Sequence, residues 1–454
     1  MLTCSLSTVH CCKSATLDTM AKLPIRAVLV FCLFLLSAIA FLDRTNITIA
    51  GPHILSEFAL DNVQLGWVIS AFLVGYALSQ VLAGWIAVRL GPRRALTLAV
   101  LWWGAFTLAT ALVPPAMPHA LALLIAVRLS LGIGEAIIYP ASNQFVAHWI
   151  PVPERGTVNG VIFAGIGIGA GLTPPLLTAI MAVHGWRSAF WFSAAVGVIA
   201  GIAWFLIARD TPERHPLVSP GELRTIHAGI PEPQPESCTK PGIPWRTILT
   251  SPTVLALTFA CFTFGYVAWI FLGWFFLYLA QARHLDLKAS AFYTMFPFIA
   301  VTLFCLLGGV LGDWISSRWG LRAGRCGPGF FSLLLTAGFL IVGPRVSSAP
   351  AAALTLAVGI GVLYISQSSY WAVTADIAGH NAGVVSAVMN VGPQIGGALT
   401  ASLTPWLAQR FGWTSAFLAA AIVAIAGALA WLAVNPETRL VAATAPATTQ
   451  AQAQ

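Results

Sequence analysis

The chain has 454 residues, of which 58% are hydrophobic and only 8% are charged, and its net charge is +8. Soluble domains carry about 25% charged residues, so this composition excludes an ordinary soluble fold. Apolar runs of about 20 residues recur along the chain, whereas the alternating segments of a β-barrel do not occur. We therefore expect an all-α polytopic membrane protein whose positive charge reflects loop topology rather than nucleic-acid binding.

The apolar runs predict twelve transmembrane helices. In chain order they cover residues 25–50, 65–87, 95–114, 119–147, 157–182, 189–208, 253–280, 290–312, 328–344, 350–375, 383–408 and 414–434. The long polar connection after the sixth run divides the chain into two halves. The predicted parts are a leader (1–24, with Met20 as an alternative start), a first six-helix half (25–208), a linker (209–252), a second six-helix half (253–434) and a disordered tail (435–454).

Basic residues are concentrated in the loops that lie on the same side as the linker and both termini. The loop after the eighth run, for example, contains Arg318, Arg322 and Arg325. Because Lys and Arg are enriched in cytoplasmic loops, this side is predicted to be cytoplasmic.

The two predicted halves repeat each other in sequence. The segment from Gly185 to Phe190 matches the segment from Gly412 to Phe417, and each follows the fifth run of its half. In the same way, Gly84-Trp-Ile-Ala-Val-Arg matches Gly309-Val-Leu-Gly-Asp-Trp. Two repeated six-helix halves are typical of secondary transporters, whose substrate site lies between the halves near the middle of the membrane.

Charged side chains inside the predicted helices are concentrated in the first half. Asp43 and Arg44 are neighbours in the first run, and Arg128 and Glu135 lie two turns apart in the fourth. Each such charge costs about 2.5–3.5 kcal/mol to insert, so these residues mark a polar pathway. Arg44 can bind a carboxylate through two hydrogen bonds, and a buried Glu135 beside an arginine can take up and release a proton. The alternative is structural ion pairing, of Arg44 with Asp43 and of Arg128 with Glu135.

The second half carries neutral polar groups inside its predicted helices. These groups can read the uncharged part of a substrate by hydrogen bonds and stacking. The candidates are Tyr266, Ser369, Trp371, Asn390 and Gln394. Asp376, at the cytoplasmic end of the tenth run, is expected to act as a gate or a helix cap.

Several segments together resemble the anion:cation symporter branch of the major facilitator superfamily. They are Phe41-Leu-Asp-Arg-Thr-Asn46, Ser70 to Tyr76, Gly84 to Arg94, Arg128 to Glu135, Pro153 to Gly156, and Val388-Met-Asn390 with Gly396-Gly397. The resemblance implies the major facilitator fold and transport of organic anions such as sugar acids, often with protons. It also implies that Arg44 and Tyr76 bind the anion, while Asp43, Glu135 and Arg128 serve proton coupling.

The chain departs from the family pattern in the loop after the second run. The pattern there is Gly-x-x-x-Asp-Arg-x-Gly, but Val88 stands at the Asp position, whereas the repeated copy keeps Asp313. We therefore expect an altered balance between the two transport conformations. The residues expected to act in gating are Arg89, Arg93, Asp313 and Arg318.

A second departure lies in the fifth run. Members that carry polyhydroxy acids often have Ser and Gln there, but residues 163–169 read Phe-Ala-Gly-Ile-Gly-Ile-Gly. These glycines permit close helix packing and offer no side-chain donor. A heavily hydroxylated substrate is therefore not expected from this segment.

The sequence predicts a transporter that imports a small organic carboxylate by proton symport through alternating access, in the cell inner (plasma) membrane. The alternatives are an organic anion or phosphate exchanger without proton coupling, and a membrane sensor that binds an organic anion without transport. An enzyme and a metal site are not expected, because no nucleophile–base constellation or metal-ligand spacing is present. We expect no cofactor apart from the coupling proton, and a monomer. The organic acid that is carried, and whether Asp43 or Glu135 is the main proton site, stay open.

Overall fold

The computed structural model describes residues 24–230 and 244–440. Within these ranges the chain is helical and contains no β-strand, which confirms the all-α class. The predicted leader, apart from Pro24, and most of the predicted tail lie outside the described residues.

The helices follow one another in chain order with short connections. The first half contains α1 (Ile25–Phe58), α2 (Asn62–Leu112), α3 (Ala120–Glu135), α4 (Ile138–Trp149), η1 (Val152–Glu154), α5 (Arg155–His184) and α6 (Trp186–Ile207). The linker contributes η2 (Pro212–Arg214) and α7 (Pro220–Gly229). The second half contains α8 (Trp245–Thr250), α9 (Pro252–Gly273), α10 (Phe275–Gln281), α11 (Leu287–Trp319), α12 (Leu321–Val342), η3 (Gly343–Arg345), α13 (Ala349–Ile365), α14 (Gln367–Ala378), η4 (Gly379–Asn381), α15 (Ala382–Phe411) and α16 (Trp413–Trp431).

Ten stretches of the described chain are long and apolar enough to cross a membrane. Two of them, Gln64–Leu112 and Ala349–Phe411, each contain two of the predicted spans. Within α2 the second and third spans meet at Gly91, whose φ of 76° interrupts the helical geometry just before Pro92. The chain is thus a multi-pass membrane protein, and the count of twelve spans stays a prediction.

The sequence repeat is matched by a repeat in backbone geometry. Gly185 has a φ of 78° and Gly412 a φ of 84°, and each immediately precedes the last long helix of its half. A positive φ is accessible to glycine at little cost because glycine has no Cβ. The repeated Gly-Trp pair therefore marks the same tight turn in both halves.

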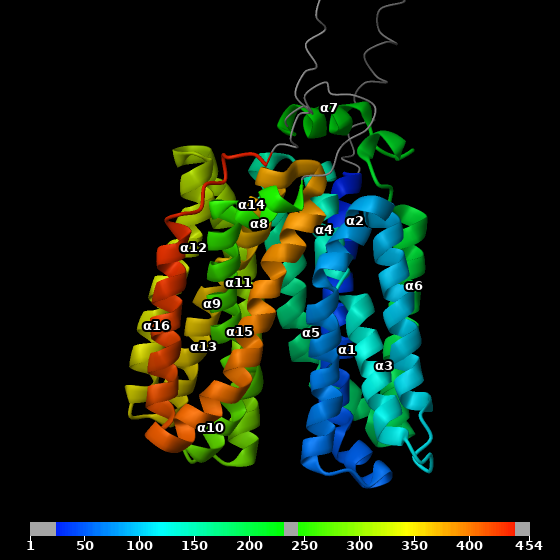
Figure 1. The fold of residues 1–454 in the computed structure, drawn as a ribbon, viewed down its shortest axis with the longest axis vertical. Coiled ribbons are helices and arrows are strands. Elements are labelled where there is room, and N and C mark those ends of the chain that lie inside the picture. The colour runs from blue at the N-terminus through cyan, green and yellow to red at the C-terminus, as the bar shows by residue number, and fades with distance from the viewer. Residues whose placement is uncertain (1–23, 231–243, 441–454) are drawn as a thin grey trace, which may run out of the picture.

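The two halves stand side by side, and the linker helix α7 lies at one end of the bundle (Figure 1). We call this the linker end, and the opposite end, which contains residues 113–119 and 282–286, the loop end. Between the halves, α2 packs against α15, α5 against α11 and α14, and α4 against α14 and α15. The ribbons of the two halves approach each other at the linker end and diverge toward the loop end (Figure 1).

The glycines of α5 let this helix pack closely on both halves. A Cβ at Gly165 or Gly169 would collide with the backbone of α1, and one at Gly167 would collide with the backbone carbonyl of Phe298 on α11. Such close backbone approach is typical of membrane helices, where small residues form the interfaces. The glycine run thus places α5 between the core of the first half and the second half.

Candidate functional site

Four charged residues gather in the middle of the first half, between α1 and α3. The Nε atom of Arg44 lies 2.5 Å from Oε1 of Glu135. Arg128 is close enough to interact electrostatically with both Glu135 and Asp43. When all four are ionised, the two acids and two bases leave the cluster without net charge. An additional anion would therefore need a compensating positive charge in order to enter.

The pairing within this cluster crosses between helices. Neighbouring residues on an α-helix point about 100° apart, so Asp43 and Arg44 face different partners. Arg44 pairs with Glu135, while Asp43 accepts a hydrogen bond from the Thr107 hydroxyl at 3.3 Å. The alternative expectation that Arg44 only pairs with its neighbour Asp43 is therefore wrong. Arg128 lies beside Glu135, but the hydrogen bond to the Glu135 carboxylate comes from Arg44.

Aromatic rings surround the guanidinium group of Arg44. Its central carbon lies 4.7 Å from the ring centroid of Phe41, 4.8 Å from that of Tyr76 and 5.5 Å from that of Phe72. The ring of Tyr139 follows at 6.0 Å. Cation–π attraction holds the charge here in a mostly apolar setting, at about 0.5–2 kcal/mol per ring. The predicted anion-site residues Arg44 and Tyr76 are thus brought together.

Arg44 differs from the rest of the cluster in its access to solvent. Its side chain is 19% exposed, whereas that of Glu135 is fully buried. In addition, Nη2 of Arg44 and Oε2 of Glu135 have no hydrogen-bond partner within the described residues. Buried polar groups are normally satisfied, because leaving one unpaired costs about 1–3 kcal/mol. Arg44 therefore combines a partly exposed side chain with a buried N–H group that has no partner among the described residues.

Asn390 of the second half contacts the face of α2 that carries Tyr76 and Gln80. Its side-chain Nδ2 donates to the hydroxyl of Tyr76 at 3.3 Å and to Oε1 of Gln80 at 3.1 Å. Gln80 was not among the predicted site residues. It lies one turn beyond Tyr76 on the same helix face, and this spacing was the signal that could have identified it.

Tyr139 is a second site residue that the sequence analysis did not predict. Its ring lies 4.9 Å from Phe163 and 5.7 Å from Trp371, and its hydroxyl is 3.1 Å from that of Ser37. Tyr139 therefore connects the surroundings of Arg44 to the predicted second-half residue Trp371.

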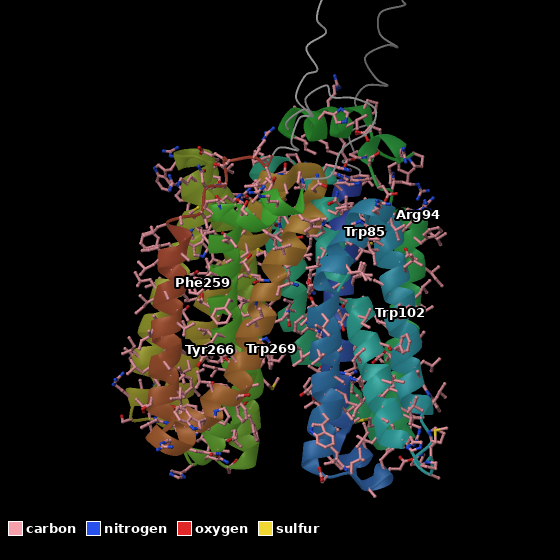
Figure 2. The ribbon with its side chains drawn as sticks, viewed as in Figure 1. Trp85, Arg94, Trp102, Phe259, Tyr266 and Trp269 are labelled. Atoms are coloured by element: carbon pink, nitrogen blue, oxygen red, sulfur yellow. The ribbon has the colours of Figure 1, made fainter. Side chains whose placement is uncertain are left out.

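The other predicted second-half residues do not converge in the same way. Tyr266 is buried on α9, where its backbone carbonyl accepts a hydrogen bond from Thr400. Ser369 is buried in α14, and Gln394 is partly exposed on α15. In Figure 2, Tyr266 lies inside the second half and Trp269 lies on its side toward the first half.

Of the predicted gating residues, Asp313 joins the two halves. Its carboxylate accepts hydrogen bonds from the backbone N–H groups of Gly156 and Thr157, at 3.0 and 2.5 Å. Arg89 stacks on Trp85, and Arg93 bonds the carbonyl of Phe205, so both act inside the first half. Arg318 is exposed at the end of α11.

Asp313 belongs to a buried network that we call the charged clamp, formed by Arg155, Asp313, Arg325 and Asp376. Arg325 bonds Asp313 at 2.7 Å and Asp376 at 3.0 Å, and Arg155 of the first half bonds Asp376 at 2.8 Å. The clamp ties α5 to α11, α12 and α14 at the linker end. Arg325 was predicted only as a cytoplasmic loop charge, but it is 1% exposed.

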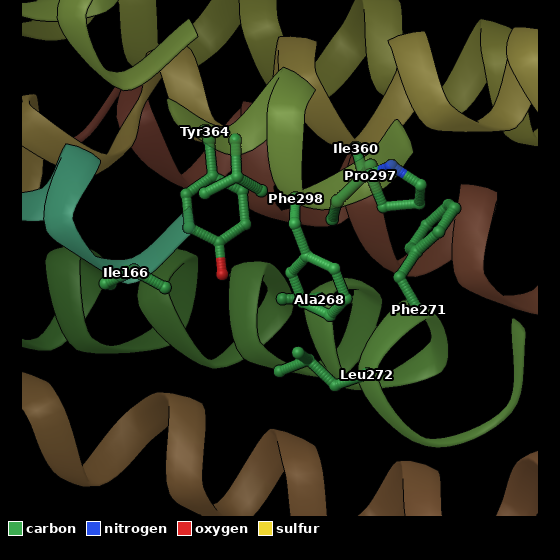
Figure 3. A pocket seen from close by; sticks show the side chains of 9 residues that line it. Ile166, Ala268, Phe271, Leu272, Pro297, Phe298, Ile360 and Tyr364 are labelled. Carbon is green, nitrogen blue, oxygen red and sulfur yellow. The ribbon is translucent and has the colours of Figure 1, made fainter. Parts of the chain in front are cut away.

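A small recess lies where α5 meets the second half (Figure 3). Its lining is apolar except for the Tyr364 hydroxyl, which is close enough to Tyr139 and Arg44 to interact with them electrostatically. The other lining residues are Ile166, Ala268, Phe271, Leu272, Pro297, Phe298, Val301 and Ile360. The recess thus offers few hydrogen-bonding groups.

Within residues 24–230 and 244–440, no three His, Cys, Asp or Glu side chains gather closely enough to hold a metal ion.

A family model described as Major Facilitator Superfamily matches residues 33–401. The chain belongs to the Major Facilitator Superfamily. It is 33% identical to the probable sulfoacetate transporter of Cupriavidus necator over 402 residues, covering 88% of this chain and 91% of the relative. It is 29% identical to the hexuronate transporter of Bacillus subtilis, covering 90% of this chain and 93% of the relative.

Other relatives are named for different substrates. One is the chloroplastic sodium-dependent phosphate transport protein 1 of Arabidopsis thaliana, 28% identical over 92% of this chain and 80% of the relative. Among solved structures, a superfamily proton:xylose symporter bound to 6-bromo-6-deoxy-D-glucose matches with a TM-score of 0.68 at 15% identity, covering 89% of this chain and 95% of that one. That likeness establishes the fold, because the two helix arrangements agree despite little sequence identity.

Proposed function

We propose that the protein is a secondary transporter that carries a small organic anion together with a proton by alternating access. The observation that carries the proposal is the ion pair between the partly exposed Arg44 and the buried Glu135. An anion that binds Arg44 competes with Glu135 for the same guanidinium group. Protonation of Glu135 removes that competition and balances the charge of the incoming anion.

This coupling follows from the charge balance of the cluster. Asp43, Arg44, Arg128 and Glu135 are together neutral when ionised, and three of them are almost fully buried. Adding an anion alone would leave an uncompensated negative charge in a medium of low polarity, which is costly. Adding a singly charged anion with one proton keeps the cluster neutral, whereas a dianion such as sulfoacetate, with its sulfonate and carboxylate both ionised, needs two protons, for which Glu135 and Asp43 offer two sites. Asp43 is the second acid that can receive the proton.

The substrate that fits best is a compact anion with few hydroxyl groups. Arg44, Tyr76, Gln80 and Asn390 supply polar groups on one side of the site. The recess on the other side is apolar except for Tyr364. A short acid such as sulfoacetate, named for one relative, matches this lining better than a polyhydroxy acid such as a hexuronate.

We infer import from the end of the bundle at which the two halves are joined. The two halves are joined by polar contacts at the linker end, including the ion pair of Arg155 with Asp376. With the linker and both termini in the cytoplasm, as their basic residues predict, these contacts close the cytoplasmic side. The first step is then uptake of proton and anion from outside. We place the protein in the inner membrane as a monomer.

Uptake into proteoliposomes with an imposed inward proton gradient tests this proposal. Sulfoacetate and a hexuronate serve as separate labelled probes. We expect the wild type to accumulate sulfoacetate, and Glu135→Gln to lose accumulation while it still exchanges internal for external substrate. If Glu135→Gln still concentrates substrate against its gradient, the assignment of the proton to Glu135 is wrong.

Exchange without proton coupling is the second candidate function. The Nε atom of the buried Arg128 has no hydrogen-bond partner in the part of the chain that the structure describes, which favours exchange, since a second arginine could bind an anion directly. Exchange would be supported if the rate of counterflow by the wild type did not depend on the pH gradient and Arg128→Ala lost substrate binding. Proton-driven accumulation by the wild type would reject it.

A further inference from the structure

The repeat places Val88 and Asp313 at equivalent points of the two halves. A Cβ added at Gly309 would touch the carbonyl of Gly156 and the backbone of the next residue, at the start of α5. A Cβ added at Gly84 would touch the carbonyl of Gly383 and the backbone of the next residue, at the start of α15. Val88 follows Gly84 by one turn, just as Asp313 follows Gly309. By the repeat, Val88 takes the position toward the start of α15 that Asp313 takes toward the start of α5, and its neighbour Ala87 has its Cβ 3.2 Å from the point where a Cβ at Gly383 would lie.

The two helix starts are satisfied by different side chains. Asp313 accepts from the N–H groups of Gly156 and Thr157, but valine at position 88 has no acceptor. The N–H of Gly383 donates instead to Oε1 of Gln144 on α4, at 2.8 Å. The same amide donates through Nε2 to the carbonyl of His380 at 2.6 Å.

Gln144 makes these bonds across the interface between the halves. It is fully buried in the first half, while Gly383 and His380 lie in the second half at the linker end. Next to it, Asn143 donates to the Thr374 hydroxyl at 2.9 Å, also across the interface. Its two partners in the second half are backbone groups of η4 and of the beginning of α15, the helix that carries Asn390 two turns further on. A third contact, between Nε2 of Gln144 and Nε2 of His148 at 3.1 Å, stays within α4.

We propose that Gln144 takes the place of the missing loop acid: it holds the start of α15 against the first half, closes this side of the linker end, and thereby positions Asn390. Its role in the transport cycle rests on the proposed function, whereas its role in closure can be tested without any substrate. The two halves are then held together at the linker end by two different kinds of contact. The charged clamp secures α5, and the neutral amide of Gln144 secures α15.

The difference in chemistry has a direct consequence for opening. A hydrogen bond from a backbone N–H to a carboxylate is roughly twice as strong as one to a neutral acceptor. The α15 side therefore separates more readily than the α5 side. Replacing a loop acid by Gln144 lowers the cost of opening the linker end without removing the contact that closes it.

Spin-label distances across the linker end test the proposal on the full-length protein. One label goes on Thr225, exposed on α7, and the other on Ser317, exposed at the end of α11, after the native cysteines are replaced. Helix α7 reports on the first half, because Glu222 accepts hydrogen bonds from the backbone of Ile25 and Arg26. We expect Gln144→Met, which keeps the side-chain length, to raise the ratio of long to short distances about tenfold, as expected for the two hydrogen bonds that are lost across the interface.

A rescue experiment with an acid at position 88 distinguishes the loss of a specific hydrogen bond from a general loss of packing. Val88→Asp added to Gln144→Met is expected to restore the short distance, because the new carboxylate accepts from Gly383. Val88→Asp alone is expected to keep the linker end closed. Gln409→Met, at an exposed position near the loop end of α15, is the matched control and is expected to change nothing.

The proposal is overturned if Gln144→Met leaves the distances unchanged, if Val88→Asp does not restore closure in the double variant, or if Val88→Asp alone opens the linker end. None of these outcomes depends on uptake. Failure of the transporter proposal would show instead as an absence of accumulation and counterflow by a wild-type protein whose distances respond to Gln144→Met.

Discussion

Arg44 and Glu135 form an ion pair between two helices of the first half, with Nε and Oε1 separated by 2.5 Å. The acid is fully buried and the base is partly exposed, so a solute can approach this pair only from the side of the arginine. Most of the functional behaviour expected of this protein follows from that asymmetry.

Arg44→Lys is expected to weaken anion binding by about 10- to 100-fold, because lysine cannot form the paired hydrogen bonds of a guanidinium group. Titration of sulfoacetate by thermal shift on purified protein measures the effect, since a ligand of the native state raises its apparent stability. Arg94→Lys, at an exposed position on α2, is the control and should bind normally. Equal affinity of Arg44→Lys and wild type would remove Arg44 from the anion site.

Asp43→Asn is expected to impair proton-driven accumulation while leaving anion affinity within about threefold of wild type. The reason is that Asp43 bonds Thr107 and lies beside Arg128, whereas the anion group Arg44 pairs with Glu135. Uptake with and without a pH gradient, together with the binding titration, separates the two effects. A loss of affinity as large as that of Arg44→Lys would mean that Asp43 supports the anion site directly.

Arg325→Met is expected to destabilise the protein strongly, because it leaves Asp313 and Asp376 buried without their shared partner. Removing one member of a buried ion pair costs about 3–5 kcal/mol. Thermal unfolding in detergent measures the loss. Arg322→Met, one turn earlier on α12 and exposed, should lower the unfolding temperature little. Similar unfolding temperatures for the two variants would show that the charged clamp does not stabilise this state.

Valine at two nearby glycines of α5 is expected to have different effects. Gly165 packs on α1 within the first half, so Gly165→Val should lower folding yield. Gly167 packs on α11 of the second half, so Gly167→Val should leave the first half intact and push the halves apart. Yield of monodisperse protein reports the first effect, and the Thr225–Ser317 spin-label distance reports the second. Identical behaviour of the two variants would contradict the assignment of these faces.

Much of the candidate site could be predicted because buried charge is conspicuous in an apolar sequence. Asp43, Arg44, Arg128 and Glu135 were identified from their insertion cost alone, and all four lie in one cluster. Neutral residues carry no comparable signal. Gln80, Tyr139 and Gln144 were missed because an amide or a phenol in an apolar helix looks the same whether it faces lipid, core or the opposite half.

The sequence by itself determined the membrane class, the two repeated halves and the set of charged residues, because hydropathy, repeats and insertion cost are properties of the local chain. Only the tertiary structure decided which acid Arg44 meets, because the rotation of α1 and its packing on α3 fix the direction of each side chain. The same holds for Arg325, a loop charge in the sequence that becomes the centre of a buried clamp through the approach of Asp313 and Asp376. Position 88 is a further example. Valine replaces the usual acid there, and folding brings the Gln144 amide of α4 to the N–H of Gly383 instead.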